Sequence, residues 1–365
     1  MPSHARTRMV VLAILLVLTM LLALGAGQYT LPLPRVAGIL LDKARGLAIE
    51  PIHQQIIFQI RLPRILCAGI AGAALALSGA SLQGIFRNPL VDPHVIGVTS
   101  GAAFGGTMAI FLGLGIYGLF FSTLLAGLVT LVLIFVFSHR LIQRSLLMLI
   151  LTGMIISGFF SALVSLLQYL SDTEDKLPSI VFWLMGSFAT SNPQKLLMLV
   201  VPVTLCSVVL LGLRWRMNLM SLGEEEARAL GIETRVLRPV LIAAATLVTA
   251  ASVSVTGVIG WIGLLVPHVA RLLVGPDFRR LLPASLVLGA GYLLAVDLVA
   301  RGEASAADVD TAMRLGTNYP RGPIEWGREI GFDTVHAQLV ELDAHFPGGR
   351  YRPSPALTDG SLDGA

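Results

Sequence analysis

Residues 93–137 read PHVIGVTSGAAFGGTMAIFLGLGIYGLFFSTLLAGLVTLVLIFVF and contain no Asp, Glu, Lys or Arg. A bilayer core is crossed by about 20 apolar helical residues, each rising about 1.5 Å, so this run is too long for one crossing. Gly113, Gly115 and Gly118 would interrupt it. The run therefore predicts two membrane-spanning helices joined near these glycines.

The whole chain has the composition of a membrane protein. Of its 365 residues, 55% are hydrophobic and 13% charged, and the mean hydropathy is +0.79. A soluble domain carries about 25% charged residues, so this chain cannot cover a water-facing surface of the usual kind. We expect an all-α polytopic membrane protein.

Counting apolar runs of about 20 residues predicts nine spans within residues 1–301, which form the expected transmembrane domain. The spans are 9–27, 65–84, two in 93–137, 145–170, 196–213, two in 239–270 divided at Gly257 and Gly260, and 282–300. The first is read as a retained span, because its apolar core is longer than that of a secretion signal. Gly and Ala are dense at 68–74 and 101–106, which predicts a compact bundle with close helix contacts.

The distribution of basic residues predicts the orientation of the chain in the membrane. Lys and Arg concentrate in cytoplasmic loops. If the N-terminus is inside, 13 of the 21 Lys and Arg residues in 1–301 lie in cytoplasmic segments. These are Arg6, Arg8, Arg87, Arg140, Arg144, Arg214, Arg216, Arg228, Arg235, Arg238, Arg271, Arg279 and Arg280. Nine spans place Arg301 and the residues after it on the outer side.

No energy source is recognisable in the sequence. It lacks the Gly-x-x-x-x-Gly-Lys-Ser/Thr phosphate loop. An ion-coupled carrier usually buries carboxylates at mid-membrane, whereas the only acid within a predicted span is Asp297, four residues before Arg301. An ion pair between Asp297 and Arg301 near the end of a helix would explain why an acid lies within this span. An energy source on another subunit is favoured, with an ion-coupled secondary transporter as an alternative.

The sequence predicts no metal or disulfide framework. Cys67 and Cys206 lie in apolar runs, where an unpaired cysteine packs as a small hydrophobe. His94 and His268 stand beside prolines at span ends and are interpreted as satisfied interfacial histidines.

Two polar segments are candidate docking sites. Residues 217–232, MNLMSLGEEEARALGI, predict a cytosolic helix with a capping box from Ser221 to Glu224 and a stop at Gly231. It is either a loop helix or a docking surface for an ATPase. Arg61 and Arg64, before the second span, are either snorkelling anchors or a site for a carboxylate-bearing partner.

Four motifs in order resemble one known family over about residues 8–301. The motifs are RLPRILCAGIAGAALALSGASLQGIFRNPLVDPHVIGVTSGAAFGG (61–106), FWLMGSF (182–188), SLGEEEARALGI (221–232) and GVIGWIGLLVPHVARLLVGPDFRRLLPAS (257–285). They resemble the FecCD-type permeases of type II ATP-binding-cassette importers for iron siderophores, haem and cobalamin. The resemblance implies a homodimer in the bacterial cytoplasmic membrane, with ten spans per subunit and a substrate path at the dimer interface. It also implies two cytosolic ATPase subunits, which hold the ATP and Mg, and an extracytoplasmic binding protein.

The resemblance also implies site residues. The ATPase-coupling element would comprise Ser221, Leu222, Gly223, Glu224, Glu225, Glu226, Ala227, Arg228, Leu230 and Gly231. Arg61, Arg64 and Arg301 would meet acidic residues of the binding protein. The implied function is inward transport of an iron siderophore or similar metal chelate by alternating access, with no catalytic residue, cofactor or metal in this chain.

Residues 302–365 depart from this family, which would continue into a tenth span. They hold 10 acidic and 5 basic residues and no apolar run that could cross a bilayer, which predicts a soluble helical tail. DVDTAMRLGTNYPRGPIEW (308–326) and GGRYRPSP (348–355) resemble the C-terminal domain of 3-hydroxyacyl-CoA dehydrogenases. The junction suggests a chimera, by deletion, assembly error or deliberate fusion. A membrane-anchored dehydrogenase fragment is thus an alternative, expected to be inactive because no dinucleotide-binding fold precedes it.

Overall fold

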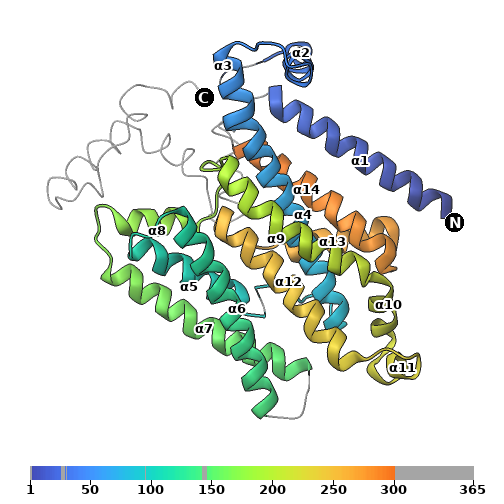
Figure 1. Cartoon of the computed structure of the whole chain (residues 1–365). Coiled ribbons are helices and arrows are strands. Elements are labelled where there is room, and N and C mark those ends of the chain that lie inside the picture. Colours follow the sequence, from blue (N-terminus) through green and yellow to red (C-terminus); the bar gives the residue numbers. More distant parts are fainter. Residues whose placement is uncertain (1, 26–28, 30, 95, 142–145, 301–365) are drawn as a thin grey trace, which may run out of the picture. The chain divides into compact units, whose positions relative to one another are not determined.

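A computed structural model describes residues 2–25, 29, 31–94, 96–141 and 146–300. By contact the chain divides into two units, Met1–Asp297 and Leu298–Ala365, and the predicted soluble tail lies outside the described residues. Every regular element in the described part is a helix (Figure 1). These helices are α1 (Pro2–Gly25), α2 (Leu33–Ala44), α3 (Pro51–Gln54), the π-helical η1 (Gln55–Arg61), α4 (Leu62–Phe86), α5 (Val98–Phe111), α6 (Ile116–Leu141), α7 (Leu146–Leu170), α8 (Lys176–Leu184), α9 (Pro193–Gly212), α10 (Arg214–Leu222), α11 (Glu224–Ala229), α12 (Thr234–Thr256), α13 (Ile262–Val274) and α14 (Phe278–Ala300).

The apolar helices match the predicted spans. Among the described residues, seven helices are long and apolar enough to cross a membrane, and α5 and α13 are shorter apolar helices. The predicted breaks are confirmed, because α5 gives way to α6 at residues 112–115 and α12 to α13 at residues 257–261. At 14 and 13 residues, the two short helices extend only about 20 Å, less than the roughly 30 Å of the hydrocarbon core.

An irregular segment precedes each short helix, and the two segments meet. The Nε2 atom of His94, before α5, lies 3.3 Å from the carbonyl oxygen of Ile259, before α13. Non-helical backbone is tolerated at membrane depth only where protein or a water-filled cavity satisfies its polar groups. The interpretation of His94 as a satisfied histidine is confirmed.

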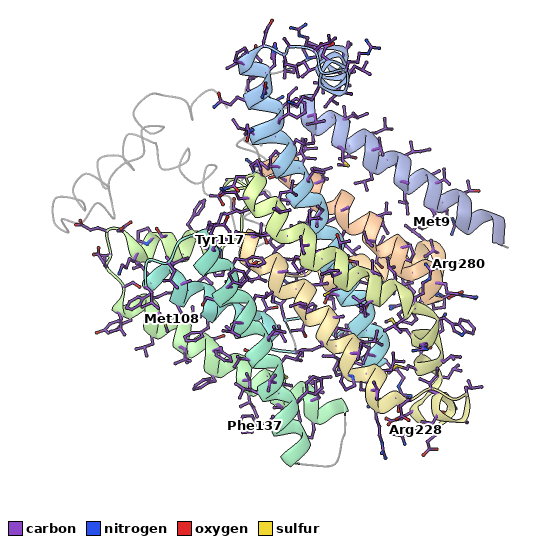
Figure 2. The ribbon with its side chains drawn as sticks, in the orientation of Figure 1. Met9, Met108, Tyr117, Phe137, Arg228 and Arg280 are labelled. Atoms are coloured by element: carbon purple, nitrogen blue, oxygen red, sulfur yellow. The ribbon has the colours of Figure 1, made fainter. Side chains whose placement is uncertain are left out.

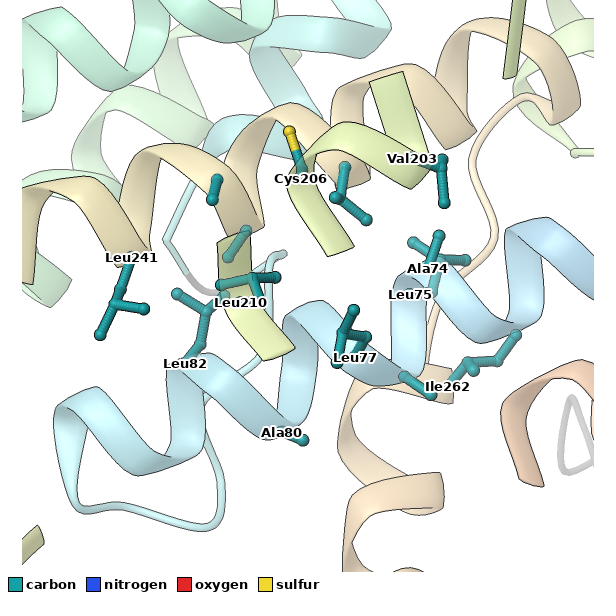
Figure 3. Packing of buried hydrophobic residues seen from close by; sticks show 14 of the residues in the cluster. Ala74, Leu75, Leu77, Ala80, Leu82, Val203, Cys206, Leu210, Leu241 and Ile262 are labelled. Atoms are coloured by element: carbon teal, nitrogen blue, oxygen red, sulfur yellow. The ribbon is translucent and has the colours of Figure 1, made fainter. Parts of the chain in front are cut away.

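Helix α4 occupies the centre of the bundle and contacts α9, α12 and α13. Figure 3 shows Leu77 and Leu82 of α4 packed with Leu210 of α9 and Leu241 of α12. The predicted span 65–84 lies within a longer helical segment, because α3, η1 and α4 follow one another without a break from Pro51 to Phe86. Both cysteines are buried in the described core, so their interpretation as packing residues is confirmed.

Short helices outside the predicted spans are α2, α3, η1, α8, α10 and α11. Of these, α8 packs on α5, where the indole of Trp183 fills the space beside Gly106. No side chain other than hydrogen fits at Gly106 without moving that ring. The motif FWLMGSF is thus a packing element of the bundle.

The hydrogen bonds at the ends of α1 agree with the predicted topology. At its start, the Nη1 atom of Arg8 donates to the carbonyl oxygen of Leu273, near the end of α13 (2.6 Å). At its other end, the carbonyl oxygen of Leu24 accepts from Arg61 of η1 (2.6 Å). The start of α1 therefore lies on the side where α13 ends, and its end on the side where α4 begins, as the predicted order of spans requires.

Backbone contact sets the spacing between α4 and two neighbouring helices. A Cβ atom added at Gly79 would overlap the carbonyl group of Gly263 in α13, and one added at Gly72 would overlap that of Gly289 in α14. Helices in lipid gain much of their association energy from such close approach.

We expect Gly79→Ala to lower the thermal midpoint of the detergent-purified protein by several degrees. Forcing a methyl group into packed backbone costs about 1–3 kcal/mol. Gly69→Ala is the matched control, because an added Cβ there meets nothing within 4 Å and Ala favours the helix by about 0.5–1 kcal/mol. Equal midpoints for the two variants would contradict the close contact.

Candidate functional site

The chain between α9 and α12 folds into two short helices at one end of the bundle, α10 and α11 (Figure 1). Gly223 separates them with φ 151° and ψ 164°, a conformation that only glycine adopts readily. Arg228 of α11 and Arg280 of α14 both lie toward this end (Figure 2). The predicted docking segment 217–232 includes most of α10 and the whole of α11, which is the expected short polar helix.

The predicted capping box is wrong. The hydroxyl of Ser221 donates to the carbonyl oxygen of Asn218 in α10 (2.6 Å), and the residue that precedes α11 is Gly223, with no side-chain cap. Ser221 lies within α10, which ends at Leu222, and the turn at Gly223 separates it from the start of α11. Three acids do fill the first turn of α11, where the helix dipole favours negative charge.

The predicted stop at Gly231 is confirmed. Gly231 has φ +81°, its N–H donates to the carbonyl oxygen of Arg228 (2.9 Å), and the N–H of Ile232 donates to that of Ala227 (2.9 Å). This pair of bonds is a Schellman motif, which satisfies carbonyl groups left free at a helix end.

Glu224 ties α11 to α12. Its carboxylate accepts from Arg238 of α12 (2.9 Å) and forms an ion pair with Arg228 of its own helix. The hydrogen bond from Arg238 lowers the pKa of Glu224 below its ordinary value of 4.5. The interaction therefore stabilises the fold at pH above that value and is lost as the pH falls through the lowered pKa. Arg238 was not identified as a site residue from the sequence. The basic residues in the first turns of the next helix were a signal for a partner of the acids in α11.

A polar cluster ties α10 to α14. The Asn218 amide of α10 donates from Nδ2 to Oδ1 of Asp277 (2.7 Å), and its oxygen accepts from the backbone N–H of Phe278 (2.8 Å). Hydrogen bonds from Arg279, above all, hold the pKa of Asp277 far below its ordinary value. Arg279 also lies over the ring of Trp215 in α10, 4.9 Å from its centroid. This cluster was not predicted from the sequence, although an Asp that follows Gly-Pro and precedes an apolar run is a helix-start signal.

The outer surface of α10 and α11 suits a protein partner. Leu222 and Leu230 are 60% and 57% exposed between charged side chains. Gly231, next to Leu230 in the chain, lines a cavity of about 320 Å³ whose other walls are mostly apolar side chains with one acidic and one basic residue. Its lining is Leu213, Arg216, Gly231, Ile232, Glu233, Val236, Leu237 and Val240. Exposed apolar side chains beside a hollow are typical of interaction sites.

Arg61 and Arg64 make internal contacts at the other end of α4. Arg61 is 6% exposed and donates to the carbonyl oxygens of Leu24, Gly25 and Tyr29. Arg64 pairs with Asp297 of α14, with its Nη2 atom 2.8 Å from Oδ1. Arg61 is thus no snorkelling anchor, because its head group is buried in protein. Docking to a binding protein stays a prediction for both arginines, and Arg301 lies outside the described residues.

Asp297 is 3% exposed, and the described structure gives it a partner from α4. From its spacing alone, Asp297 was expected to pair with Arg301, four residues later. The bond to Arg64 joins positions 233 residues apart, which no local spacing reveals. It fastens the ends of α4 and α14 to each other.

We expect Glu224→Gln to speed tryptic cleavage after Arg228 several-fold at pH 8. The amide loses the charge that holds Arg238, so α11 separates from α12 more often. Cleavage is followed by the masses of the fragments. Glu225→Gln is the control, because Glu225 is exposed, and equal rates for the two variants would show that the ion pair does not hold α11.

We expect Asp297→Ala to lower the free energy of unfolding by about 3 kcal/mol, because it leaves the Arg64 guanidinium largely buried without this carboxylate. The midpoint of thermal unfolding in detergent measures the effect. The double variant R64M/D297L should recover most of the loss, since an apolar pair of similar volume avoids the desolvation cost. No recovery would mean that Asp297 stabilises the bundle through another contact.

Comparison with known proteins agrees with this architecture. The model of the FecCD transport family matches residues 15–315. A second family model, the C-terminal domain of 3-hydroxyacyl-CoA dehydrogenase, matches residues 284–362. Both predicted resemblances are confirmed, and the two matches overlap at residues 284–315.

Relatives and a solved structure cover most of the chain. The molybdate import system permease protein MolB of Haemophilus influenzae is 60% identical over 313 residues, 86% of this chain and 92% of that protein. An iron chelatin transport system permease of Helicobacter pylori is 41% identical over 249 residues, 67% and 74% of the two chains. An inward-facing ABC transporter of the metal-chelate type has 56% identity and a TM-score of 0.74, covering 84% of this chain and 94% of that one.

These relatives are permease subunits, which are transporters whose ATPase is a separate subunit. The chain belongs to the FecCD transport family, as a multi-pass inner-membrane permease of a type II ATP-binding-cassette importer.

Proposed function

We propose that the surface of α10 and α11 binds the ATPase and that the permease imports molybdate. Docking is supported by the exposed Leu222 and Leu230 and by the cavity that Gly231 and Ile232 line. It is also supported by the ties to the membrane helices, from Glu224 to Arg238 and from Asn218 to Asp277. A surface that receives force from another subunit must be attached to the membrane helices if it is to move them.

The proposed assembly has two copies of this chain, two ATPase subunits and one extracytoplasmic binding protein. At the outer end, the Arg64 side chain is 22% exposed while paired with Asp297. A guanidinium has five N–H donors, so Arg64 has donors left for a carboxylate of the binding protein. Arg61, being buried, would act indirectly by holding the end of α1, and Arg301 would complete the docking site.

Molybdate is favoured by the 60% identity with the molybdate permease, extending over 92% of that protein. This observation carries the proposal. The iron chelatin permease is less similar, at 41% over 74% of its length.

An iron siderophore or another metal chelate, including haem and cobalamin, is the second candidate. It is supported by the sequence motifs and by the similarity to a solved transporter of the metal-chelate type. Both candidates use the same pathway in our proposal, at the interface between two copies.

The carboxylate in the described spans is already paired with an arginine and so does not form a site for a cation. The carboxylate within them, Asp297, is buried and bonded to Arg64. Ionisable groups inside a membrane domain usually mark ion or substrate sites, and this one serves the packing of α4 on α14. We propose that the binding protein selects the ligand.

We expect proteoliposomes that contain the permease, its ATPase and its binding protein to take up radiolabelled molybdate only when ATP is hydrolysed. Labelled ferric siderophore, haem and cobalamin are tested in parallel. Molybdate uptake at background with strong uptake of one chelate would replace the first candidate by the second.

The same preparation distinguishes an ATP-driven importer from an ion-coupled carrier and from a dehydrogenase. Uptake that persists without ATP but stops when the proton gradient is dissipated would identify an ion-coupled carrier. NADH production from a hydroxyacyl-CoA would identify a dehydrogenase. Failure of any ATPase to co-purify with the full chain would contradict docking at α10 and α11.

A further inference from the structure

The first turn of α14 is capped by a side chain that comes from α10. The first four N–H groups of a helix need partners from outside the helix. Asp277 supplies one, since its Oδ1 atom accepts from the N–H of Arg279 (3.0 Å). The N–H of Phe278 instead donates to Asn218, 60 residues earlier in the chain (2.8 Å).

Two hydrogen bonds thus join α10 to the start of α14, and both are partly buried. The bond from Nδ2 of Asn218 reaches a carboxylate, and bonds to charged groups are stronger than neutral ones. The carboxylate also lies at a helix N-terminus, where the dipole favours it. A shift of α10 would break these bonds unless the start of α14 moves with it.

Helix α14 connects this end of the bundle to the other. Its 23 residues extend about 34 Å. Near its far end, Asp297 is bonded to Arg64 at the start of α4. One continuous helix therefore runs from the α10 attachment to the ion pair at the opposite end.

The attachment of α11 is separate. Glu224 connects α11 to α12 through Arg238, and Gly223 lies between α10 and α11 in a conformation that only glycine adopts readily. The two short helices can therefore move different membrane helices.

We infer that Asn218 is a positioning residue for coupling: through Asp277 and the start of α14, it transmits movement of the ATPase-binding surface to the Arg64–Asp297 pair at the outer end. This inference rests on the proposed docking of an ATPase at α10 and α11. Coupling between two sites is reciprocal. Events at the outer end, such as arrival of the binding protein, therefore also reach the ATPase through this connection.

The test uses the reconstituted full transporter and the variant Asn218→Ala. The measured quantities are substrate taken up per ATP hydrolysed and the stimulation of ATP hydrolysis by the binding protein. We expect the ATPase to remain bound while both quantities fall roughly fivefold, because the two bonds between α10 and α14 are lost.

Asn88→Ala is the matched control. The side-chain oxygen of Asn88 accepts from the N–H of Leu90 (2.9 Å) within one local turn. The variant loses a bond of the same type and similar length but disconnects no pair of helices, so both quantities should stay at the wild-type level.

A charge exchange tests the contact itself. N218D places two carboxylates against each other and should lose coupling. N218D/D277N restores a donor opposite a carboxylate and keeps an acceptor for Phe278, but the new amide weakens the bonds that Arg279 donates to Asp277, so uptake per ATP should rise clearly above that of N218D without reaching the wild-type level. This recovery keeps the test valid if Asn218→Ala fails to fold.

The outcomes separate the two proposals. Wild-type transporter that binds no ATPase would remove both the docking proposal and this inference. Bound and active ATPase, with unchanged uptake per ATP in N218A and N218D, would overturn the inference alone. Lost coupling in N218D without recovery in N218D/D277N would overturn it as well.

Discussion

Direct backbone contact around α4 is the constraint on which the rest of the structure depends. Lipid tails are as apolar as leucine, so helices in a membrane are held together by close packing and by polar contacts. No Cβ atom fits at Gly79 of α4 against Gly263 of α13, nor at Gly72 of α4 and Gly289 of α14, which face each other. This spacing brings α14 near enough to α4 for Asp297 to reach Arg64, and it fixes where the start of α14 meets α10.

The few charged side chains of the described membrane unit act mainly at helix ends, where they connect one helix to another. Arg64 and Asp297 join α4 to α14, Glu224 and Arg238 join α11 to α12, and Arg61 holds the end of α1. Each contact fixes one joint between two elements of the bundle. Such an arrangement suits a transporter, whose helices must change their packing without coming apart.

Hydropathy predicted the spans well because each crossing needs a long apolar run, a property that is local in sequence. The break after α5 and the stop at Gly231 were also predictable, since glycine marks them. The capping box failed because Ser221 and Glu224 have the right spacing, whereas Gly223 turns the chain between them. The partners of Asp297 and Asn218 could not be predicted, because they are 233 and 59 residues away and meet only through the packing of α4, α10 and α14.

The cap on α14 differs in kind from the other polar contacts of the bundle. An ion pair between long side chains can stretch or rotate while its partners move apart by an ångström or more. A short asparagine that accepts from a backbone N–H has less freedom, because its side chain has only two rotatable bonds and the N–H is fixed to its helix. The contact between Asn218 and Phe278 therefore resists small displacements that the pair of Glu224 with Arg238 would absorb. If α10 and α11 receive the same push, α14 should respond to it before α12 does, and the outer ends of α4 and α14 are then the first part of the far side to move.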